Sequence, residues 1–341
     1  MWKVRFLALA GLLVFITAPV SVHGQSPTGE VTPEPGTFMN PVLDRDFPDP
    51  DVLQVGDVYY AYATNALGMN VQVARSTDLV TWEFLYEAMP GRPAWSVPSF
   101  GYVWAPEVTT FDGETFLMYF VARFDDGAGG RQCLGMATSP VPEGPFTPLD
   151  EAPIVCQLEQ GGSIDPSVFV DVDGAPYLLW KNDGNAIGEP TWVYIQPLSA
   201  DGLTLEGQPT ALITADQPWE GTLVEAPILW LHDGQYVLFY SANAYGDARY
   251  AVGYARSDSL LGPYEKPEAP MLETSIPNGI VGPGGQDVVT DAEGADWLLL
   301  HGWGPNNYRR LYLAPLEWMD DGPVVSARLN APLPVPAVGG A

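Results

Sequence analysis

Four carboxylates stand beside prolines at recurring places in this 341-residue chain. They lie in the segments Asp49-Pro50, Pro106-Glu107, Asp165-Pro166 and Glu225-Ala226-Pro227. Each segment precedes a strand-like run, and Pro50 predicts that Asp49 is extended at the start of such a run. Carboxylates that converge in a pocket without clusters of basic residues suit two chemistries, metal binding and the hydrolysis of glycosides.

Glycoside hydrolysis needs one protonated carboxyl group, which assists the leaving oxygen, and one ionised carboxylate, which acts on water or on the sugar. Crowded acids supply both forms, because like charges raise each other's proton affinity while hydrogen bonds keep one of them ionised. Aromatic side chains that can stack on a sugar face occur nearby, at Phe47 and at Trp104. These residue types favour a sugar-cleaving site.

A sequence repeat predicts how the four acids meet. A glycine followed by an aromatic and apolar run occurs five times, at Gly56, Gly113, Gly174, Gly234 and Gly294. Successive glycine numbers differ by 57, 61, 60 and 60. Asp-Gly dipeptides, which favour hairpin turns, predict that most copies begin with two antiparallel strands. No helical periodicity is present. Five units of about 60 residues with three or four strands each predict an all-β fold, a five-bladed β-propeller.

The position of the acids within the repeat supports a shared site. The first strand of each propeller blade runs along the central channel, so acids at the starts of four such strands are expected to converge at one mouth of it. Acids that merely belonged to surface turns would be scattered rather than locked to the repeat.

The two ends of the chain are predicted to lie outside the propeller. Residues 1–24 read as a signal peptide, with Lys3 and Arg5 before an apolar run, which predicts a secreted protein. Residues 25–37 read as a flexible linker, residues 38–330 as the propeller, and residues 331–341 as a loose C-terminal tail.

The charge and the cysteine content of the chain limit the classes of partner and the compartment that are expected. The chain has 14 basic and 42 acidic residues, a net charge of −28, which disfavours nucleic acid and anionic polysaccharides and leaves a neutral substrate acceptable. No membrane partner is expected. The two cysteines, Cys133 and Cys156, are predicted to form a disulfide in an oxidising compartment.

The motifs together resemble glycoside hydrolase family 43 over nearly the whole mature chain. The resemblance rests on the segments Asp46-Phe47-Pro48-Asp49-Pro50-Asp51, Val103-Trp104-Ala105-Pro106-Glu107, Gly162-Ser163-Ile164-Asp165-Pro166-Ser167, Val224-Glu225-Ala226-Pro227 and Arg309-Arg310-Leu311-Tyr312. It implies a five-bladed propeller that hydrolyses arabinose- or xylose-containing glycosides with inversion of configuration, on a neutral pentose polysaccharide or oligosaccharide outside the cell.

The resemblance also implies roles for individual residues. Asp49 is the expected general base, Glu225 the general acid, and Asp165 the residue that orients the acid and tunes its proton affinity. The expected substrate-binding residues, with Arg309 reaching toward the buried sugar, are Phe47, Trp104, Glu107, Asn182, Gln286, His301 and Arg309.

Further segments resemble an arabinanase-like branch of the family and favour arabinan over xylan. These are Trp180-Lys181-Asn182-Asp183-Gly184-Asn185, Gly284-Gly285-Gln286 and the two cysteines. Many relatives carry a histidine in the Gly-Pro-Gly-His turn of the last blade, where this chain has Gly285. No cofactor is therefore expected to be required, no metal ligands are assigned, and a structural ion in the central channel stays open.

The principal hypothesis is a secreted, inverting glycosidase that acts on α-L-arabinofuranosyl linkages, as an exo-arabinofuranosidase or an arabinanase. The first alternative is a β-xylosidase that acts on xylo-oligosaccharides. A retaining, fructan-cleaving propeller would want Arg-Asp-Pro and Glu-Cys motifs, where this chain has Ile164-Asp165-Pro166 and Glu225-Ala226. A non-catalytic sugar-binding propeller is disfavoured by the filled catalytic positions. An inverting enzyme is expected to hold its two carboxyl groups about 6.5–9.5 Å apart.

Overall fold

The computed structural model describes residues 34–98, 103–127, 130–149 and 152–339. The predicted signal peptide and most of the predicted linker lie outside these ranges. Within them no helix has the length and apolar character to cross a membrane. The helical segments there are one-turn 3₁₀ helices: η1 (Leu158–Gln160), η2 (Gly184–Ala186), η3 (Pro218–Glu220), η4 (Ile276–Asn278) and η5 (Pro305–Asn307).

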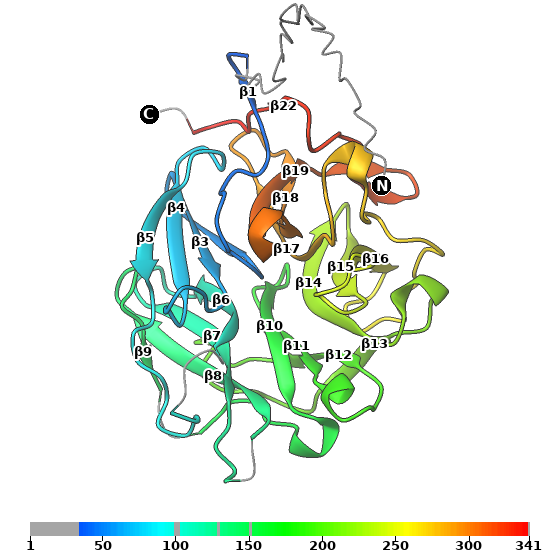
Figure 1. The fold of residues 1–341 in the computed structure, drawn as a ribbon. Helices are drawn as coiled ribbons and strands as arrows, with labels where there is room; N and C mark the ends of the chain where they lie inside the picture. The colour runs from blue at the N-terminus through cyan, green and yellow to red at the C-terminus, as the bar shows by residue number, and fades with distance from the viewer. Residues whose placement is uncertain (1–33, 99–102, 128–129, 150–151, 340–341) are drawn as a thin grey trace, which may run out of the picture. The chain divides into compact units, whose positions relative to one another are not determined.

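Five antiparallel sheets follow one another along the chain and confirm the predicted five-bladed β-propeller (Figure 1). Blade 1 contains β2 (Asp51–Val55), β3 (Val58–Ala63), β4 (Gln72–Ser76) and β5 (Glu83–Glu87). Blade 2 contains β6 (Trp104–Thr110), β7 (Phe116–Arg123), β8 (Gln132–Ser139) and β9 (Thr147–Pro148). Blade 3 contains β10 (Ser163–Val170), β11 (Pro176–Asn182), β12 (Trp192–Pro197) and β13 (Thr210–Thr214). Blade 4 contains β14 (Val224–His232), β15 (Gln235–Ala242) and β16 (Ala251–Ser257), and blade 5 contains β17 (Gly284–Thr290), β18 (Asp296–Trp303) and β19 (Arg309–Pro315).

The repeat glycines form the turn between the first two strands of each blade. All five have positive φ, from 60° at Gly56 to 86° at Gly294, and a Cβ added to any of them would meet no atom within 4 Å. They are therefore needed for backbone conformation rather than for space.

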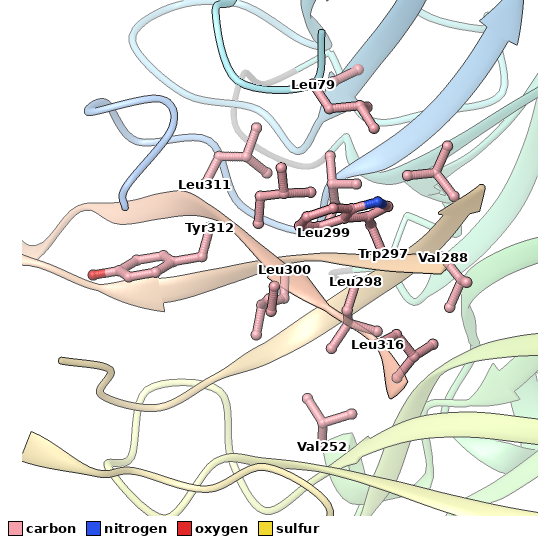
Figure 2. Close-up of a cluster of buried hydrophobic side chains, with 14 of the residues drawn as sticks. Leu79, Val252, Val288, Trp297, Leu298, Leu299, Leu300, Leu311, Tyr312 and Leu316 are labelled. Carbon is pink, nitrogen blue, oxygen red and sulfur yellow. The ribbon is translucent and has the colours of Figure 1, made fainter. Parts of the chain in front are cut away.

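The second strand of each blade is buried along almost its whole length, because neighbouring blades cover both of its faces. This explains the continuous apolar runs that the repeat displays. In blade 5, Leu298, Leu299 and Leu300 are fully buried, and the same cluster includes Val252 of blade 4 and Leu79 of blade 1 (Figure 2). Blade 5 is thus packed between blades 4 and 1, which closes the ring.

The N-terminal segment also closes the ring through its backbone. Leu43 pairs with Leu311 of β19, so the chain that leads into blade 1 adds an outer edge to blade 5. Nearby, β1 (Thr37–Phe38) pairs with β22 (Leu333–Pro334). A short hairpin of β20 (Glu317–Met319) and β21 (Gly322–Val324) precedes β22 in the chain.

The prediction of a loose tail over 331–341 is wrong for the described part of that segment. Leu333 is 4% exposed and pairs with Phe38, and the backbone N–H of Ala337 donates to Asp291 at 3.0 Å. Composition suggested a mobile segment, but the tail finds a strand partner and an apolar site that only the folded ring supplies. Cys133 of β8 and Cys156 form a disulfide with Cα atoms 4.7 Å apart.

Candidate active site

A cavity of about 480 Å³ lies where the five innermost strands begin. Every blade contributes to its wall. The carboxylates that line it are Asp49, Asp51, Glu107, Asp165, Asp183 and Glu225. Lys181 and Arg309 are the basic residues of the lining, so the cavity is strongly acidic.

A residue in the left-handed conformation stands at the same place at the inner end of every blade. The φ values are 52° at Asp49, 40° at Ala105, 55° at Asp165, 51° at Ala226 and 53° at Gly285. In blades 2 to 5 this residue lies in a bulge, where the register of the first and second strands shifts. The bulge turns the chain toward the cavity, as bulges beside active sites commonly do.

The expectation that Asp49 is extended is therefore wrong, although Pro50 follows it. A non-glycine residue in this conformation costs on the order of 1–3 kcal/mol, so the surrounding contacts must hold it there. The four acids do not all occupy this left-handed position. Asp49 and Asp165 occupy the left-handed position, whereas Glu107 lies two residues after it and Glu225 one residue before it.

The environment of Asp49 favours its carboxylate form. The Thr64 hydroxyl donates to Oδ2 at 2.6 Å, and Arg309 Nη1 lies 3.2 Å from Oδ1 and 3.4 Å from Oδ2. Burial acts to raise the pKa of Asp49, but Arg309, His301 and Thr64 outweigh it, so the pKa falls below its ordinary value. Asp49 is thus ionised and able to accept a proton.

His301 lies directly behind Asp49 rather than in the cavity lining. It is fully buried, it stacks on Tyr250, and its Nδ1 accepts a hydrogen bond of 3.1 Å from the Asp49 backbone N–H. Burial lowers the pKa of His301 to about 3, so the ring is neutral and carries its proton on Nε2. It therefore helps to hold the strained backbone at Asp49.

Gly285 makes room for this histidine. A Cβ at position 285 would lie 2.7 Å from His301 Nδ1 and 2.9 Å from Asp49 Oδ1. Any side chain at this position would therefore collide with His301. Within the described ranges, no group of three or more His, Cys, Asp or Glu side chains is arranged to hold a metal ion.

Asp165 and Glu225 form the second acidic pair of the cavity. Burial and the Glu225 charge raise the pKa of Asp165 to about 8, although the Lys181 charge acts in the opposite direction. Asp165 Oδ2 accepts a hydrogen bond of 2.9 Å from the backbone N–H of Ala226, which ties blade 3 to blade 4 beside Glu225. Glu225 Oε2 accepts a hydrogen bond of 3.0 Å from Lys181 Nζ. The pair therefore retains a proton at neutral pH, in contrast to Asp49.

Three further buried carboxyl groups bridge neighbouring blades. Asp51 accepts from the backbone N–H of Val108 at 2.9 Å, Glu107 from that of Val168 at 2.8 Å, and Asp287 from that of Val52 at 2.8 Å. Burial and mutual repulsion raise the pKa of Glu107 to about 8, burial raises that of Asp287 to about 7, and the pKa of Asp51 is well above its ordinary value. Glu107 thus lines the cavity and joins blade 2 to blade 3.

The remaining predicted substrate-binding residues divide into two groups. Trp104 and Gln286 line the cavity, and Gln286 is fixed by hydrogen bonds of 2.7 Å to Ser241 and to the backbone oxygen of Ala226. Phe47 and Asn182 do not reach it. Phe47 is fully buried in the hydrophobic core, and Asn182 holds a loop by bonding the backbone of Gln160, Pro190 and Trp192.

Several lining residues were not found from the sequence. They are Thr64, Lys181, Asp183, Tyr245 and Tyr250. Lys181 and Asp183 flank Asn182, and the strand alternation sends them to the opposite face from it. The sequence therefore indicated the correct segment, but not which of its residues face the cavity. Tyr245 is 54% exposed at the cavity rim, with its ring centroid 4.9 Å from Arg309 Cζ.

Comparison with known proteins agrees with this geometry. The sequence model of the glycosyl hydrolases family 43 matches residues 38–324. The chain belongs to this family. The crystal structure of a thermostable family-43 glycoside hydrolase is 31% identical, with a TM-score of 0.79, and the match covers 89% of this chain and 100% of that one.

The relatives that the chain matches carry names that describe different activities. A putative beta-xylosidase of Xylanibacter ruminicola is 30% identical over 295 residues, covering 85% of this chain and 50% of the relative. An extracellular endo-alpha-(1->5)-L-arabinanase of Bacillus subtilis strain 168 is 28% identical over 295 residues, covering 81% of this chain and 86% of the relative. The chain thus spans about half the length of the first of these relatives.

Proposed function

We propose that this family 43 chain is an inverting glycoside hydrolase that cleaves α-L-arabinofuranosyl linkages in arabinan or arabino-oligosaccharides. The proposal rests on the different protonation states of the carboxyl groups within one cavity. Asp49 is held ionised by Arg309 and Thr64, while the pair of Asp165 and Glu225 retains a proton. An inverting glycosidase needs this combination of one basic and one acidic carboxyl group.

In the proposed reaction Asp49 takes a proton from a water molecule, whose oxygen attacks the anomeric carbon of the sugar. Glu225 gives a proton to the glycosidic oxygen as the bond between that oxygen and the anomeric carbon breaks. Asp165, which accepts a hydrogen bond from the Ala226 backbone beside Glu225, helps to orient the acid. The products are the pentose with inverted configuration and the shortened chain or aglycone.

The cavity supports a neutral sugar as the substrate. Its acidic wall repels anions, and Trp104 and Tyr245 offer aromatic faces at its lining. The preference for arabinan rests on the arabinanase-like segments in blades 3 and 5 and on the similarity to the Bacillus subtilis arabinanase. Secretion, predicted from residues 1–24, fits a polymeric substrate, and three of the relatives are described as extracellular.

A β-xylosidase is the second candidate, since several relatives of similar identity carry that description. Product analysis on linear α-1,5-arabinan and on xylo-oligosaccharides tests the proposal. Arabinose alone from the start indicates exo action, and mixed arabino-oligosaccharides indicate endo action. Xylose from the second substrate alone would replace the proposal with the xylosidase. Release from neither would refute hydrolysis of both linkages.

A further inference from the structure

Lys181 is a fully buried ammonium group in the wall of the cavity. Its side chain is 0% exposed, and Nζ lies 3.0 Å from Glu225 Oε2 and 3.8 Å from Asp183 Oδ1. On β11 it pairs with Ile164 of β10, the neighbour of Asp165. Lys181 therefore links β11 to Glu225 of β14, next to the strand that carries Asp165.

A buried lysine is costly unless carboxylates compensate for its lost hydration. Burial acts to lower the pKa of Lys181, but Glu225, Asp165 and Asp183 outweigh it and raise the pKa above its ordinary value. Lys181 is thus a permanent cation at any working pH.

Another buried lysine also forms ion pairs with carboxylates, but away from the cavity. Lys266 is 4% exposed and lies 2.8 Å from Glu220 and 2.9 Å from Asp216. None of these three residues lines the cavity. This pair therefore joins structural segments, whereas the pair of Lys181 and Glu225 opens onto the site.

The charged and titratable groups that face Glu225 come from three places. Asp165 lies on β10, Lys181 and Asp183 lie on and just after β11, and Tyr250 lies just before β16. Burial and the Glu225 charge raise the pKa of Tyr250 well above its ordinary value, so its hydroxyl stays neutral. Lys181 is the cation among these groups, and its ammonium group is in direct contact with Glu225.

We propose that Lys181 is a positioning residue for the general acid, a role that rests on the proposed function. Its ammonium group holds Glu225 by Oε2, leaves Oε1 to carry the proton for the glycosidic oxygen, and sets the upper pH at which Glu225 still carries that proton. The acid is thus held by a buried cation as well as oriented by the neighbouring Asp165.

The test is the pH profile of kcat/KM for Lys181→Gln and Lys266→Gln beside the parent, on an oligosaccharide whose leaving group needs protonation. Loss of an opposite charge in direct contact shifts a carboxyl titration by about 1–3 pH units. We expect Lys181→Gln to move the alkaline limb upward by that amount. Lys266→Gln, which removes an equally buried lysine, leaves the limb in place. An unmoved limb in Lys181→Gln, even with a lower rate, would show a merely structural lysine and overturn the proposal.

Two further measurements keep the proposal testable. If Lys181→Gln does not fold, Asp183→Asn removes a negative charge and must move the limb downward; an upward or absent shift contradicts the proposal. If the parent cleaves neither pentoside, the proposed function has failed separately. The titration of the Glu225 carboxyl carbon by NMR, assigned with Glu225→Gln, then compares parent and Lys181→Gln without activity, and identical titrations would refute the role of Lys181.

Discussion

Arg309 of blade 5 reaches the carboxylate of Asp49 at the entrance of blade 1, with Nη1 3.2 Å from Oδ1. The two residues are 260 positions apart in the chain. The contact joins the last blade to the first at the point where the ring closes. It also makes the charge state of the proposed base depend on that closure.

Replacing Arg309 with methionine should therefore move the acid limb of kcat/KM to higher pH. Arg309 is one of the groups that lower the pKa of Asp49, so its loss lets burial raise that pKa. The matched control is Arg310→Met, because Arg310 pairs with Asp44 at 2.8 Å and does not line the cavity. An acid limb that stays in place in Arg309→Met would contradict the coupling.

Asp49→Asn should lower kcat by about 10²–10⁴-fold, the usual contribution of a general base. The amide keeps the size of the side chain but cannot take the proton of water. Substrate binding, followed by calorimetry, should persist. Asp44→Asn removes a neighbouring carboxylate whose side chain is 66% exposed, and it should keep full activity. A fully active Asp49→Asn enzyme would remove the base assignment.

Stability should fall as the pH rises from about 5 to 9. The pKa values of Glu107 and Asp287 are raised to about 8 and about 7, mainly by burial, and that of Asp51 is raised as well. A raised pKa in the folded state contributes stability that is complete below the ordinary value near 4 and is lost as the pH passes the folded value.

Glu107→Gln should reduce this loss of stability at alkaline pH, since the amide can still accept a hydrogen bond from Val168 N–H but does not titrate. The measurement is the thermal unfolding midpoint at pH 5, 7 and 9. The exposed Glu114→Gln serves as the control. Equal slopes in the parent and in Glu107→Gln would show that the buried carboxyl cluster does not govern alkaline stability.

Leu333→Ala should destabilise the protein by about 2–5 kcal/mol, as expected for a buried leucine. The side chain belongs to the cluster that packs blade 5 against blade 1. Val338→Ala, at a side chain that is 56% exposed in the same tail, should have little effect. Denaturant unfolding of both variants measures the difference. Equal stabilities would mean that the tail does not help to close the ring.

Much of the fold follows from local sequence. The five turn glycines and the apolar runs after them specify hairpins of fixed length, because the turn conformation and strand burial are set within a few residues. The positions of Asp49 and Asp165 in this repeat were likewise visible. Their left-handed backbone was not, since Pro50 and Pro166 locally favour extended residues and the bulge depends on pairing with the second strand.

Register and long-range partners were decided by the tertiary structure. Asn182 and Lys181 are adjacent, and which one faces the cavity depends on the alignment of β11 with β10; a shift of one residue exchanges the two faces. The tail shows the same dependence, because Leu333 has no apolar partner until blade 5 and β1 are in place.

The sequence by itself determined the number of blades, the acids available for the site and the likeness to family 43. Only the tertiary structure decided which acid is ionised, which retains a proton, and that Lys181 and Arg309 are the cations beside them. The physical reason is that residue type and spacing are local properties, whereas burial and charge proximity, which set proton affinity, arise when distant blades come together.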